Sequence, residues 1–261
     1  MASDLTADAA HAILSADEAQ SVTLSGVVKT PRKWSAEDPY LYTLVLAETS
    51  GEETVYESCQ VGFRKMTYKT NASGWFEGST GDADLIRING QPISLRGVNR
   101  HETHPEYGYA VTREVMETDI RIMKENNINA VRTCHYPDQS LWYDLCDKNG
   151  IYMIDETNLE SHGSWQKLGA IEPSWNVPGS LPEWKDCVVD RARSMLERDK
   201  NHAAVLIWSC GNESYAGEDI LAMTQFFHAK DPSRLVHYEG VVHNRAFAAI
   251  TDMESRMYTT V

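Results

Sequence analysis

Paired cysteines, long apolar runs and excess basic charge are all missing from this sequence, and each absence excludes a class of protein. The five cysteines are scattered and form no C-x-x-C pair, which argues against a disulfide framework and a structural zinc site. No apolar run approaches the roughly 18 residues of a membrane-spanning helix. The opening MASDLTADAAHAIL lacks the basic segment and apolar core of a signal peptide. We therefore expect a cytoplasmic protein, with the periplasm as the alternative because the N-terminus resembles a truncated start.

Basic residues are also scarce relative to acidic ones. The chain has 24 Lys and Arg against 38 Asp and Glu, for a net charge of −14. This balance argues against nucleic-acid and anionic-membrane partners, because both require a basic face. Seven Trp and twelve Tyr could stack on the apolar faces of sugars, although packing in the core explains most aromatic residues.

The first part of the chain has the pattern of β-structure. Strands are expected at residues 21–28 (SVTLSGVV), 40–48 (YLYTLVLAE) and, after the turn-like TSGEE, along 54–70. These strands are too few to close a sandwich by themselves. We predict a partial β-sandwich domain over residues 1–88 and a second domain over residues 89–261.

Strands and helices alternate after the hairpin signal Asn89-Gly90. Helices are predicted at residues 112–127, with Thr112 as a possible N-cap, and at 139–150, 181–201 and 217–231. Strands are predicted at residues 93–99, 128–134, 151–157, 204–210, 235–240 and 248–258. Repeated βα units indicate a parallel sheet. Six strands fall short of the eight in a TIM barrel, so an incomplete (β/α)8 barrel is expected.

Polar residues follow or close most of these predicted strands. They are Asn99, His101 and His104; Arg132 and His135; Glu156, Glu160 and His162; Asn212 and Glu213; and Met257 and Tyr258. In a parallel barrel the carboxyl ends of the strands open onto one face, where barrel enzymes carry their active sites. Core packing does not explain four successive strand ends that carry His, Arg, Glu or Asn. We therefore expect these residues to converge.

The phrase NLESHG suggests a metal site. Glu160 and His162 are two residues apart, so in extended backbone they would point the same way. With a third carboxylate, such a pair suits a divalent cation such as magnesium or manganese. The phrase RHETHP does not match the zinc-protease pattern H-E-x-x-H, because its histidines are three apart.

Four longer phrases together closely resemble glycoside hydrolase family 2, specifically its large bacterial β-galactosidases. They are RGVNRHETHP, NAVRTCHYPDQSLWYDLCDKNGIYMIDETNLESHG, RDKNHAAVLIWSCGNES and DPSRLVHYEG. The resemblance runs from about Trp34 to the C-terminus. It implies a TIM barrel preceded by the end of an immunoglobulin-like β-sandwich. It also implies cleavage of terminal β-D-galactosyl residues, as in lactose-type substrates, by an enzyme that forms homo-oligomers.

The resemblance also implies roles for individual residues. Glu213 corresponds to the general acid/base, His135 to a histidine that supports the transition state, and Tyr258 to a tyrosine that hydrogen-bonds the nucleophile. Asn212, His101, Met257 and Arg132 correspond to substrate-side or supporting positions. Glu160, His162 and Glu213 correspond to the protein ligands of a Mg²⁺ ion.

The sequence departs from the family at the nucleophile. Retaining glycosidases need two carboxyl groups, one as acid/base and one as nucleophile. The family places the nucleophile on the seventh barrel strand in a Cys-Glu-Tyr-like phrase, and this sequence has none. Glu239 and Glu254 occupy other positions. We therefore expect a fragment whose nucleophile lies in the remainder of the parent polypeptide, and which is inactive or nearly so alone.

Three alternatives remain open on the sequence. The first is another family 2 glycosidase, such as a β-glucuronidase. The second is a non-catalytic sugar-binding or complementation module that works only when assembled with another chain. The third is a hydrolase in which Glu160, His162 and Glu213 hold a truly catalytic metal.

Overall fold

The computed structural model describes residues 19–68, 86–165 and 176–258 of the chain. The chain divides into two compact units, Met1–Arg32 and Lys33–Val261. Within the first unit, residues 19–32 contain no helix or strand, so the strand predicted at residues 21–28 is wrong. A strand requires a hydrogen-bonded neighbour. Residues 21–28 pair with no strand in the described part of the chain.

A β-hairpin opens the second unit. Strands β1 (Tyr42–Ser50) and β2 (Glu53–Val61) pair antiparallel from Tyr42 opposite Val61 to Ser50 opposite Glu53. Gly51 in the connecting turn has φ +61°, which suits a two-residue hairpin loop that begins with glycine. Most residues of both strands are exposed. The hairpin is therefore sheet without a covering layer among the described residues, as expected of a partial sandwich.

A small three-stranded sheet follows. It contains β3 (Met66–Tyr68), β4 (Ile86–Ile88) and β5 (Gln91–Ile93), paired in the order β3-β4-β5. Asn89 and Gly90 form the turn between β4 and β5 with φ values of 55° and 85°, which confirms the hairpin signal. The strand predicted at residues 93–99 is interrupted. There the Asn129 side chain bonds the carbonyl of Ser94 and the N–H of Arg96, in place of a ladder.

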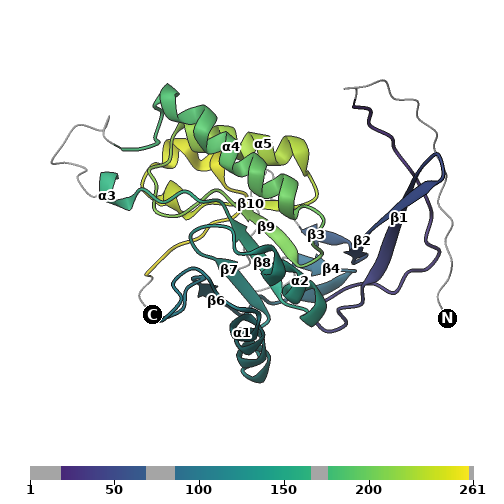
Figure 1. Cartoon of the computed structure of the whole chain (residues 1–261). Helices are drawn as coiled ribbons and strands as arrows, with labels where there is room; N and C mark the ends of the chain where they lie inside the picture. The colour runs from purple at the N-terminus through teal and green to yellow at the C-terminus, as the bar shows by residue number, and fades with distance from the viewer. Residues whose placement is uncertain (1–18, 69–85, 166–175, 259–261) are drawn as a thin grey trace. The chain divides into compact units, whose positions relative to one another are not determined.

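Five parallel strands form the main sheet. They are β6 (Gly97–Arg100), β7 (Ala130–Thr133), β8 (Tyr152–Glu156), β9 (Val205–Ser209) and β10 (Leu235–His237). The order of neighbours follows the chain, which is the topology of a barrel wall (Figure 1). The helices are α1 (Arg113–Glu125), α2 (Ser140–Asn149), α3 (His162–Trp165), α4 (Pro182–Asp199) and α5 (Glu218–Lys230).

The sixth strand, predicted at residues 248–258, is wrong. The segment instead holds the end of a 3₁₀ helix, η3 (Arg245–Ile250), and irregular backbone after it; another 3₁₀ helix, η2 (Glu239–Val242), follows β10. The segment meets the end of β10 through the backbone bond from the Asp252 N–H to the Val236 carbonyl at 2.9 Å and through side chains. Asp252 Oδ2 accepts the N–H of Val236, and Thr251 Oγ1 accepts that of Tyr238. Met257 and Tyr258 therefore do not close a strand.

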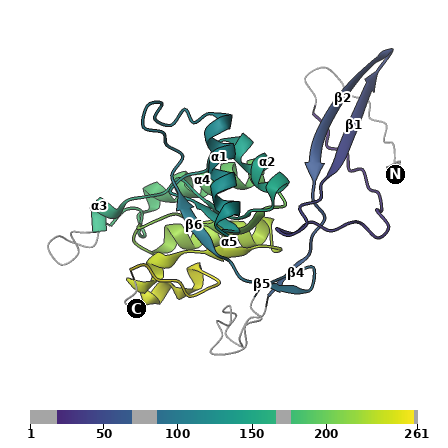
Figure 2. The same cartoon turned by 90° about the horizontal axis from the view of Figure 1, so that it is seen from below.

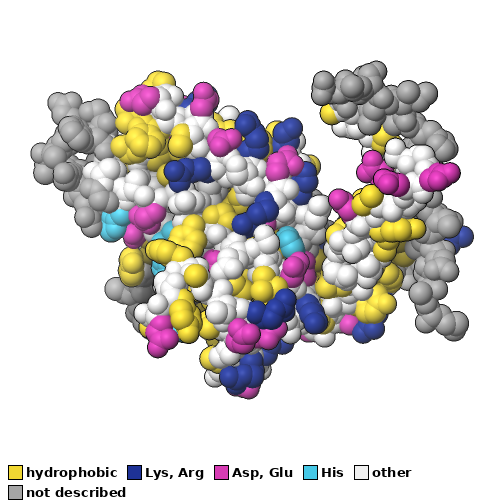
Figure 3. All heavy atoms as spheres, in the orientation of Figure 1, with side chains coloured by type: hydrophobic (Ala, Val, Ile, Leu, Met, Phe, Trp, Pro, Cys, Tyr) yellow, Lys and Arg dark blue, Asp and Glu magenta, His cyan; other side chains and the backbone are white. Residues whose placement is uncertain are grey.

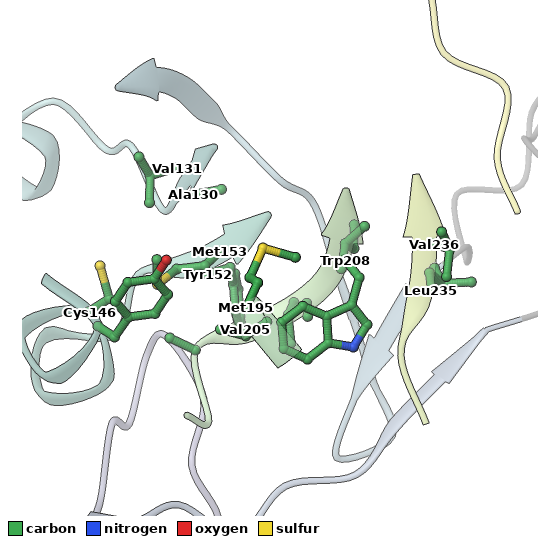
Figure 4. Close-up of a cluster of buried hydrophobic side chains, with 14 of the residues drawn as sticks. Ala130, Val131, Cys146, Tyr152, Met153, Met195, Val205, Trp208, Leu235 and Val236 are labelled. Atoms are coloured by element: carbon green, nitrogen blue, oxygen red, sulfur yellow. The ribbon is translucent and has the colours of Figure 1, made fainter. Parts of the chain in front are cut away.

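The apolar core lies between this sheet and the helices around it. Figure 4 shows Val131 of β7, Tyr152 and Met153 of β8 and Trp208 of β9 in this layer, all 1% exposed or less. Helices α1 and α2 contact each other, as do α4 and α5 (Figure 2). Gly150 ends α2 with φ +70°, as its position after the apolar pattern predicts. Thr112 occupies the N-cap of α1 but makes no side-chain capping bond.

Charged side chains of both signs lie on the described surface (Figure 3). On the face drawn in Figure 3, Lys and Arg side chains are interspersed with acidic and apolar ones. No helix in the described ranges combines the length and apolar character needed to cross a bilayer.

Candidate active site

The polar residues at the ends of the parallel strands form one connected set of contacts. The set begins at His101 beyond β6, passes through side chains of β7, β8 and β9, and ends at Glu213. The expected convergence is therefore present for most of these residues. His104 instead stacks on the ring of Tyr107, with centroids 4.6 Å apart.

Glu156, the last residue of β8, is the buried centre of the set. Its side chain is 0% exposed, and its carboxylate accepts hydrogen bonds from Arg132 Nε at 2.6 Å and Ser209 Oγ at 2.7 Å, while His135 Nδ1 lies 2.7 Å from Oε1. Burial acts to raise the pKa of Glu156, but the hydrogen bond with His135 and the Arg132 charge outweigh it and lower the pKa. Glu156 is thus held as a carboxylate that orients two basic side chains.

Arg132 joins Glu156 to Asn212. Besides Glu156, its guanidinium donates from Nη2 to Asn212 Oδ1 at 2.9 Å. The Asn212 amide nitrogen then donates to Glu160 Oε2. The orientation of the Asn212 amide is thereby fixed from both sides. Arg132 therefore contacts a carboxylate, that of Glu156, and an amide, that of Asn212.

Glu160, His162 and Glu213 come together as a possible cation site. One donor atom from each residue lies within 4.8 Å of the others, and His162 Nδ1 is 2.9 Å from Glu213 Oε2. The sequence predicted that extended backbone would bring Glu160 and His162 together, but the structure has a helical turn there. His162 begins the helical turn α3, and its N–H donates to Glu160 Oε1 at 2.9 Å. Two carboxylates and one imidazole at the surface form a donor set that fits magnesium or manganese.

The Glu213 backbone is held in a rare conformation by the end of the next strand. Glu213 has φ +39°, in the left-handed region that residues with a side chain seldom adopt. Its N–H donates to Glu239 Oε1 at 3.1 Å. The N–H of Ser214, the following residue, donates to Tyr238 Oη at 3.0 Å, and the Tyr238 hydroxyl donates a hydrogen bond to the Ser214 carbonyl. The side chains of Tyr238 and Glu239, just after β10, therefore fix the backbone of Glu213 and Ser214, which follow β9.

Glu239 itself is a buried acid. Its side chain is 4% exposed, and Oε2 has no hydrogen-bond partner among the described residues. Burial raises the pKa of Glu239, and the Arg132 charge and the Glu213 N–H act against that effect.

Gly211 lets the loops after β8 and β9 approach closely. The N–H of Asn212 donates to the carbonyl of Leu159 at 2.8 Å, and Glu160 and Asn212 form a parallel bridge. A Cβ added at Gly211 would lie 2.6 Å from that Leu159 carbonyl oxygen, and φ is +134°. Only glycine fits here, so Gly211 places Glu160 beside Asn212 and Glu213.

A cavity of about 490 Å³ adjoins Glu213. His162, Glu213, Glu239, His243, Met257 and Tyr258 are among its lining residues. Met257 and Tyr258 thus line the same cavity as Glu213 although they lie on irregular backbone. Tyr258 is 91% exposed.

His101 and His135 meet at the other end of the set. Their rings lie edge to face with centroids 5.2 Å apart. Burial lowers the pKa of His101, and the neighbouring His135 and Arg132 add to that shift. Cys134, between the two strand ends, is 1% exposed, and burial raises its pKa to about 11.

The sequence placed Glu156 at a strand end but did not predict its contacts with Arg132 and Ser209. It also did not predict that the Tyr238 hydroxyl would bond the backbone next to Glu213. Glu239 was considered only as a nucleophile. A signal for all three was available, because each closes or follows a predicted parallel strand.

Two family profiles match the chain. The profile "Glycosyl hydrolases family 2, TIM barrel domain" matches residues 81–261, and "Glycosyl hydrolases family 2" matches residues 2–64. The five-stranded sheet is accordingly part of a TIM barrel, preceded by part of the immunoglobulin-like domain of this family.

Curated relatives agree with the profiles. The chain is 55% identical over 238 residues to a β-galactosidase of Halalkalibacterium halodurans, covering 90% of this chain and 22% of that protein. It is 56% identical to a β-galactosidase of Clostridium acetobutylicum, covering 86% of this chain and 24% of that protein. It is also 50% identical to the β-galactosidase large subunit of Lactobacillus helveticus, covering 86% and 34%. The chain thus spans about a quarter to a third of these relatives.

Solved structures show the same fold. A β-glycosidase from Bacteroides vulgatus superposes with a TM-score of 0.63 at 26% identity, over 82% of this chain and 25% of that protein. A β-glucuronidase from Parabacteroides merdae superposes with a TM-score of 0.62 at 24% identity, over 83% and 26%. With the profile match over residues 81–261, these findings show that the chain belongs to glycoside hydrolase family 2.

Proposed function

We propose that this chain is the segment of a retaining β-galactosidase that carries the acid/base and the metal ligands. The observation that supports it most is the contact set that links Arg132, Asn212, Glu160, His162 and Glu213 at the carboxyl ends of successive parallel strands. The substrate class comes from the curated relatives, which are named β-galactosidases at about 50% identity.

Glu213 is the acid/base of this proposal. In the first step its carboxyl group gives a proton to the oxygen of the departing aglycone. In the second step its carboxylate takes a proton from the attacking water. The backbone N–H groups of Glu213 and Ser214 donate to the side chains of Glu239 and Tyr238, and these bonds fix the backbone from which the Glu213 side chain extends. Asn212, oriented by Arg132, presents its amide to a sugar hydroxyl, and His101 and His135 contact the sugar from the β6 and β7 side.

Glu160, His162 and Glu213 would hold a Mg²⁺ ion. When bound, the ion supplies positive charge that offsets the charge of the surrounding carboxylates. The residues of the chain hold the proton and orient the sugar. Asn212 also fixes one Glu160 oxygen, so the ligand is oriented before any ion arrives.

We place the nucleophilic carboxylate in the remainder of the longer polypeptide, called here the complete enzyme. Glu254 is engaged on the surface with Arg245 at 2.7 Å, and Glu239 bonds the Glu213 backbone. The partners of the chain are then the galactoside and the rest of that polypeptide, in a homo-oligomer. The five cysteines of this chain are all free thiols, which favours the reducing environment of the cytoplasm.

The test compares three samples on an aryl β-galactoside and an aryl β-glucuronide. We expect the complete enzyme to hydrolyse the galactoside, its Glu213→Gln variant to lose about 10²–10⁴-fold in kcat, and the 261-residue chain to show no turnover. Turnover by the chain alone at the rate of the complete enzyme would refute the assignment. Faster hydrolysis of the glucuronide would support a β-glucuronidase instead.

Two alternative hypotheses, a non-catalytic module and a catalytic metal site, predict different results. If the chain is a sugar-binding module, it should bind galactose without turnover. If it is a complementation module, activity should appear when the missing segment is added to it. A truly catalytic metal would make chelation abolish all activity, whereas a supporting Mg²⁺ leaves part of it.

A further inference from the structure

The described residues contain a second cluster of possible metal ligands beside the oxygen-rich one. One donor atom each of His101, Cys134 and His135 lies within 4.8 Å of the others. Its donors are two imidazole nitrogens and a sulfur, whereas Glu160, His162 and Glu213 offer mainly carboxylate oxygen. Donors of this kind select zinc and other thiophilic ions, while carboxylates select magnesium.

The backbone brings the three residues together. Strands β6 and β7 are in register up to Arg100 opposite Thr133, and the Cys134 N–H continues the pairing by donating to the Arg100 carbonyl at 3.0 Å. His101 and Cys134 are therefore cross-strand neighbours just beyond the sheet. His135 follows directly, and its ring meets His101.

His135 is oriented as a metal-binding histidine would be. Its Nδ1 is engaged with Glu156 Oε1 at 2.7 Å, which leaves Nε2 for another partner. A carboxylate on one ring nitrogen is the usual support for a histidine that binds metal through the other. Glu156 is itself anchored by Arg132 and Ser209, and the Arg132 charge is already paired there.

We propose that His101, Cys134 and His135 bind one thiophilic divalent cation, represented by Zn²⁺, with a fourth position left for water. Zinc bonds sulfur at about 2.3 Å and nitrogen at about 2.0 Å, so its ligand atoms lie within about 4 Å of one another. Rotation of the exposed His101 side chain closes the remaining gap. Resting on the proposed function, the site makes zinc an inhibitor that competes with galactoside, because both occupy His101 and His135.

The direct test uses Co²⁺ as a spectroscopic substitute for zinc, with the 261-residue chain. Exposed Cys59 and Cys187 are first replaced by serine so that only buried thiols remain. We expect one equivalent of Co²⁺ to give a near-ultraviolet sulfur-to-cobalt charge-transfer band and the intense visible bands of four-coordinate cobalt. Added Zn²⁺ should abolish both.

Variants assign the ligands. Cys134→Ser should remove the sulfur band, and His101→Gln, a change at an exposed side chain, should weaken Co²⁺ binding at least about 10-fold. Glu160→Gln, in the oxygen-rich cluster, and Cys146→Ser, at another buried thiol, should leave the band unchanged. Persistence of the band in Cys134→Ser, its loss in Glu160→Gln, or no band in the parent chain would overturn the proposal.

A second arm uses the complete enzyme. Zn²⁺ should raise the KM for an aryl galactoside and leave kcat unchanged, and Cys134→Ser should weaken this inhibition about 10-fold or more with the same Mg²⁺ dependence. Inhibition that excess Mg²⁺ relieves equally in both proteins would place zinc at the oxygen-rich cluster and contradict the proposal. The cobalt arm is independent of hydrolysis, so it can succeed or fail without reference to the proposed activity.

Discussion

The Oε1 atom of Glu239 accepts the backbone N–H of Glu213 at 3.1 Å, and this bond joins the ends of two neighbouring strands. Glu213 stands at φ +39°. A non-glycine residue in a sparsely populated conformation costs on the order of 1–3 kcal/mol and persists only when its surroundings hold it. The side chains of Glu239 and Tyr238 hold this backbone through hydrogen bonds to Glu213 and Ser214, so the position of Glu213, the proposed acid/base, depends on a second, buried glutamate.

Replacing Glu239 separates the hydrogen bond from the charge. Glu239→Gln keeps an acceptor oxygen, whereas Glu239→Leu has none. In the complete enzyme we expect Glu239→Leu to lose about 10–100-fold in kcat and Glu239→Gln to lose much less. In the isolated chain, hydrogen exchange at the Glu213 amide should become faster only in Glu239→Leu. Equal exchange in both variants would show that the bond does not hold the loop.

Arg132 should resist replacement by lysine. Its guanidinium reaches Glu156 and Asn212 at once, and a single ammonium group cannot reproduce that geometry. We expect Arg132→Lys to lower kcat by about 10²-fold, the cost typical of misplaced catalytic groups. Arg113→Lys, at an exposed ion pair on α1, is the matched control and should leave the rate unchanged. A fully active Arg132→Lys enzyme would count against the role given to Arg132.

Gly211→Ala tests the close approach of the loops after β8 and β9. Both Gly211 and Gly90 have positive φ, but an added Cβ meets the Leu159 carbonyl only at Gly211, and nothing within 4 Å at Gly90. Gly90→Ala therefore reports backbone strain alone. We expect Gly211→Ala to lower the free energy of unfolding by about 1–3 kcal/mol more than Gly90→Ala does. Denaturant titration of the two variants measures the difference, and equal losses would remove the steric argument.

His202 should make stability depend on pH. Its ring lies 2.7 Å from Asp147; burial acts to lower the pKa of His202, but the hydrogen bond and charge of Asp147 outweigh it and raise the pKa. The folded pKa is thus above the unfolded value. The stabilisation is complete below an unfolded pKa of about 6.5 and is lost as pH rises through the folded pKa.

His202→Asn should therefore cost about 1–2 kcal/mol of unfolding free energy near pH 5.5 and less near pH 8.5. His228→Asn, which breaks the more exposed pair with Asp252, should cost little at either pH. Urea titrations at both pH values supply the comparison. A larger loss at the higher pH would reverse the sign and exclude this explanation.

The βα alternation was sufficient to predict α1, α2, α4, α5 and most of the parallel strands, because buried strands have continuous apolar runs and Asn89-Gly90 and Gly150 are strong local signals. It did not predict the short helix α3. Three strand predictions failed or were modified for long-range reasons. Residues 21–28 have no partner strand among the described residues, and the Asn129 side chain interrupts residues 93–99. At residues 248–258, side-chain bonds of Thr251 and Asp252 take the place of most of a ladder.

In the candidate active site, too, local sequence patterns could be predicted and long-range contacts could not. The strand-end rule brought Arg132, Glu160, His162, Asn212 and Glu213 together correctly. It could not reveal that Glu156 binds Arg132 or that Glu239 bonds a backbone N–H, because these contacts depend on register between strands far apart in the sequence. The roles assigned to Glu213, Tyr258 and the Mg²⁺ ligands stay predictions. So does the domain boundary at residue 88.

The most direct test of the account is the dependence of Glu213→Ala on the leaving group. In the complete enzyme, a dinitrophenyl β-galactoside needs no protonated leaving group, so the variant should still form the glycosyl-enzyme from it but should cleave an alkyl galactoside very slowly. Azide should then accelerate turnover and yield β-galactosyl azide, because an anionic nucleophile needs no general base. Equal losses on both substrates without any azide product would show that Glu213 is not the acid/base.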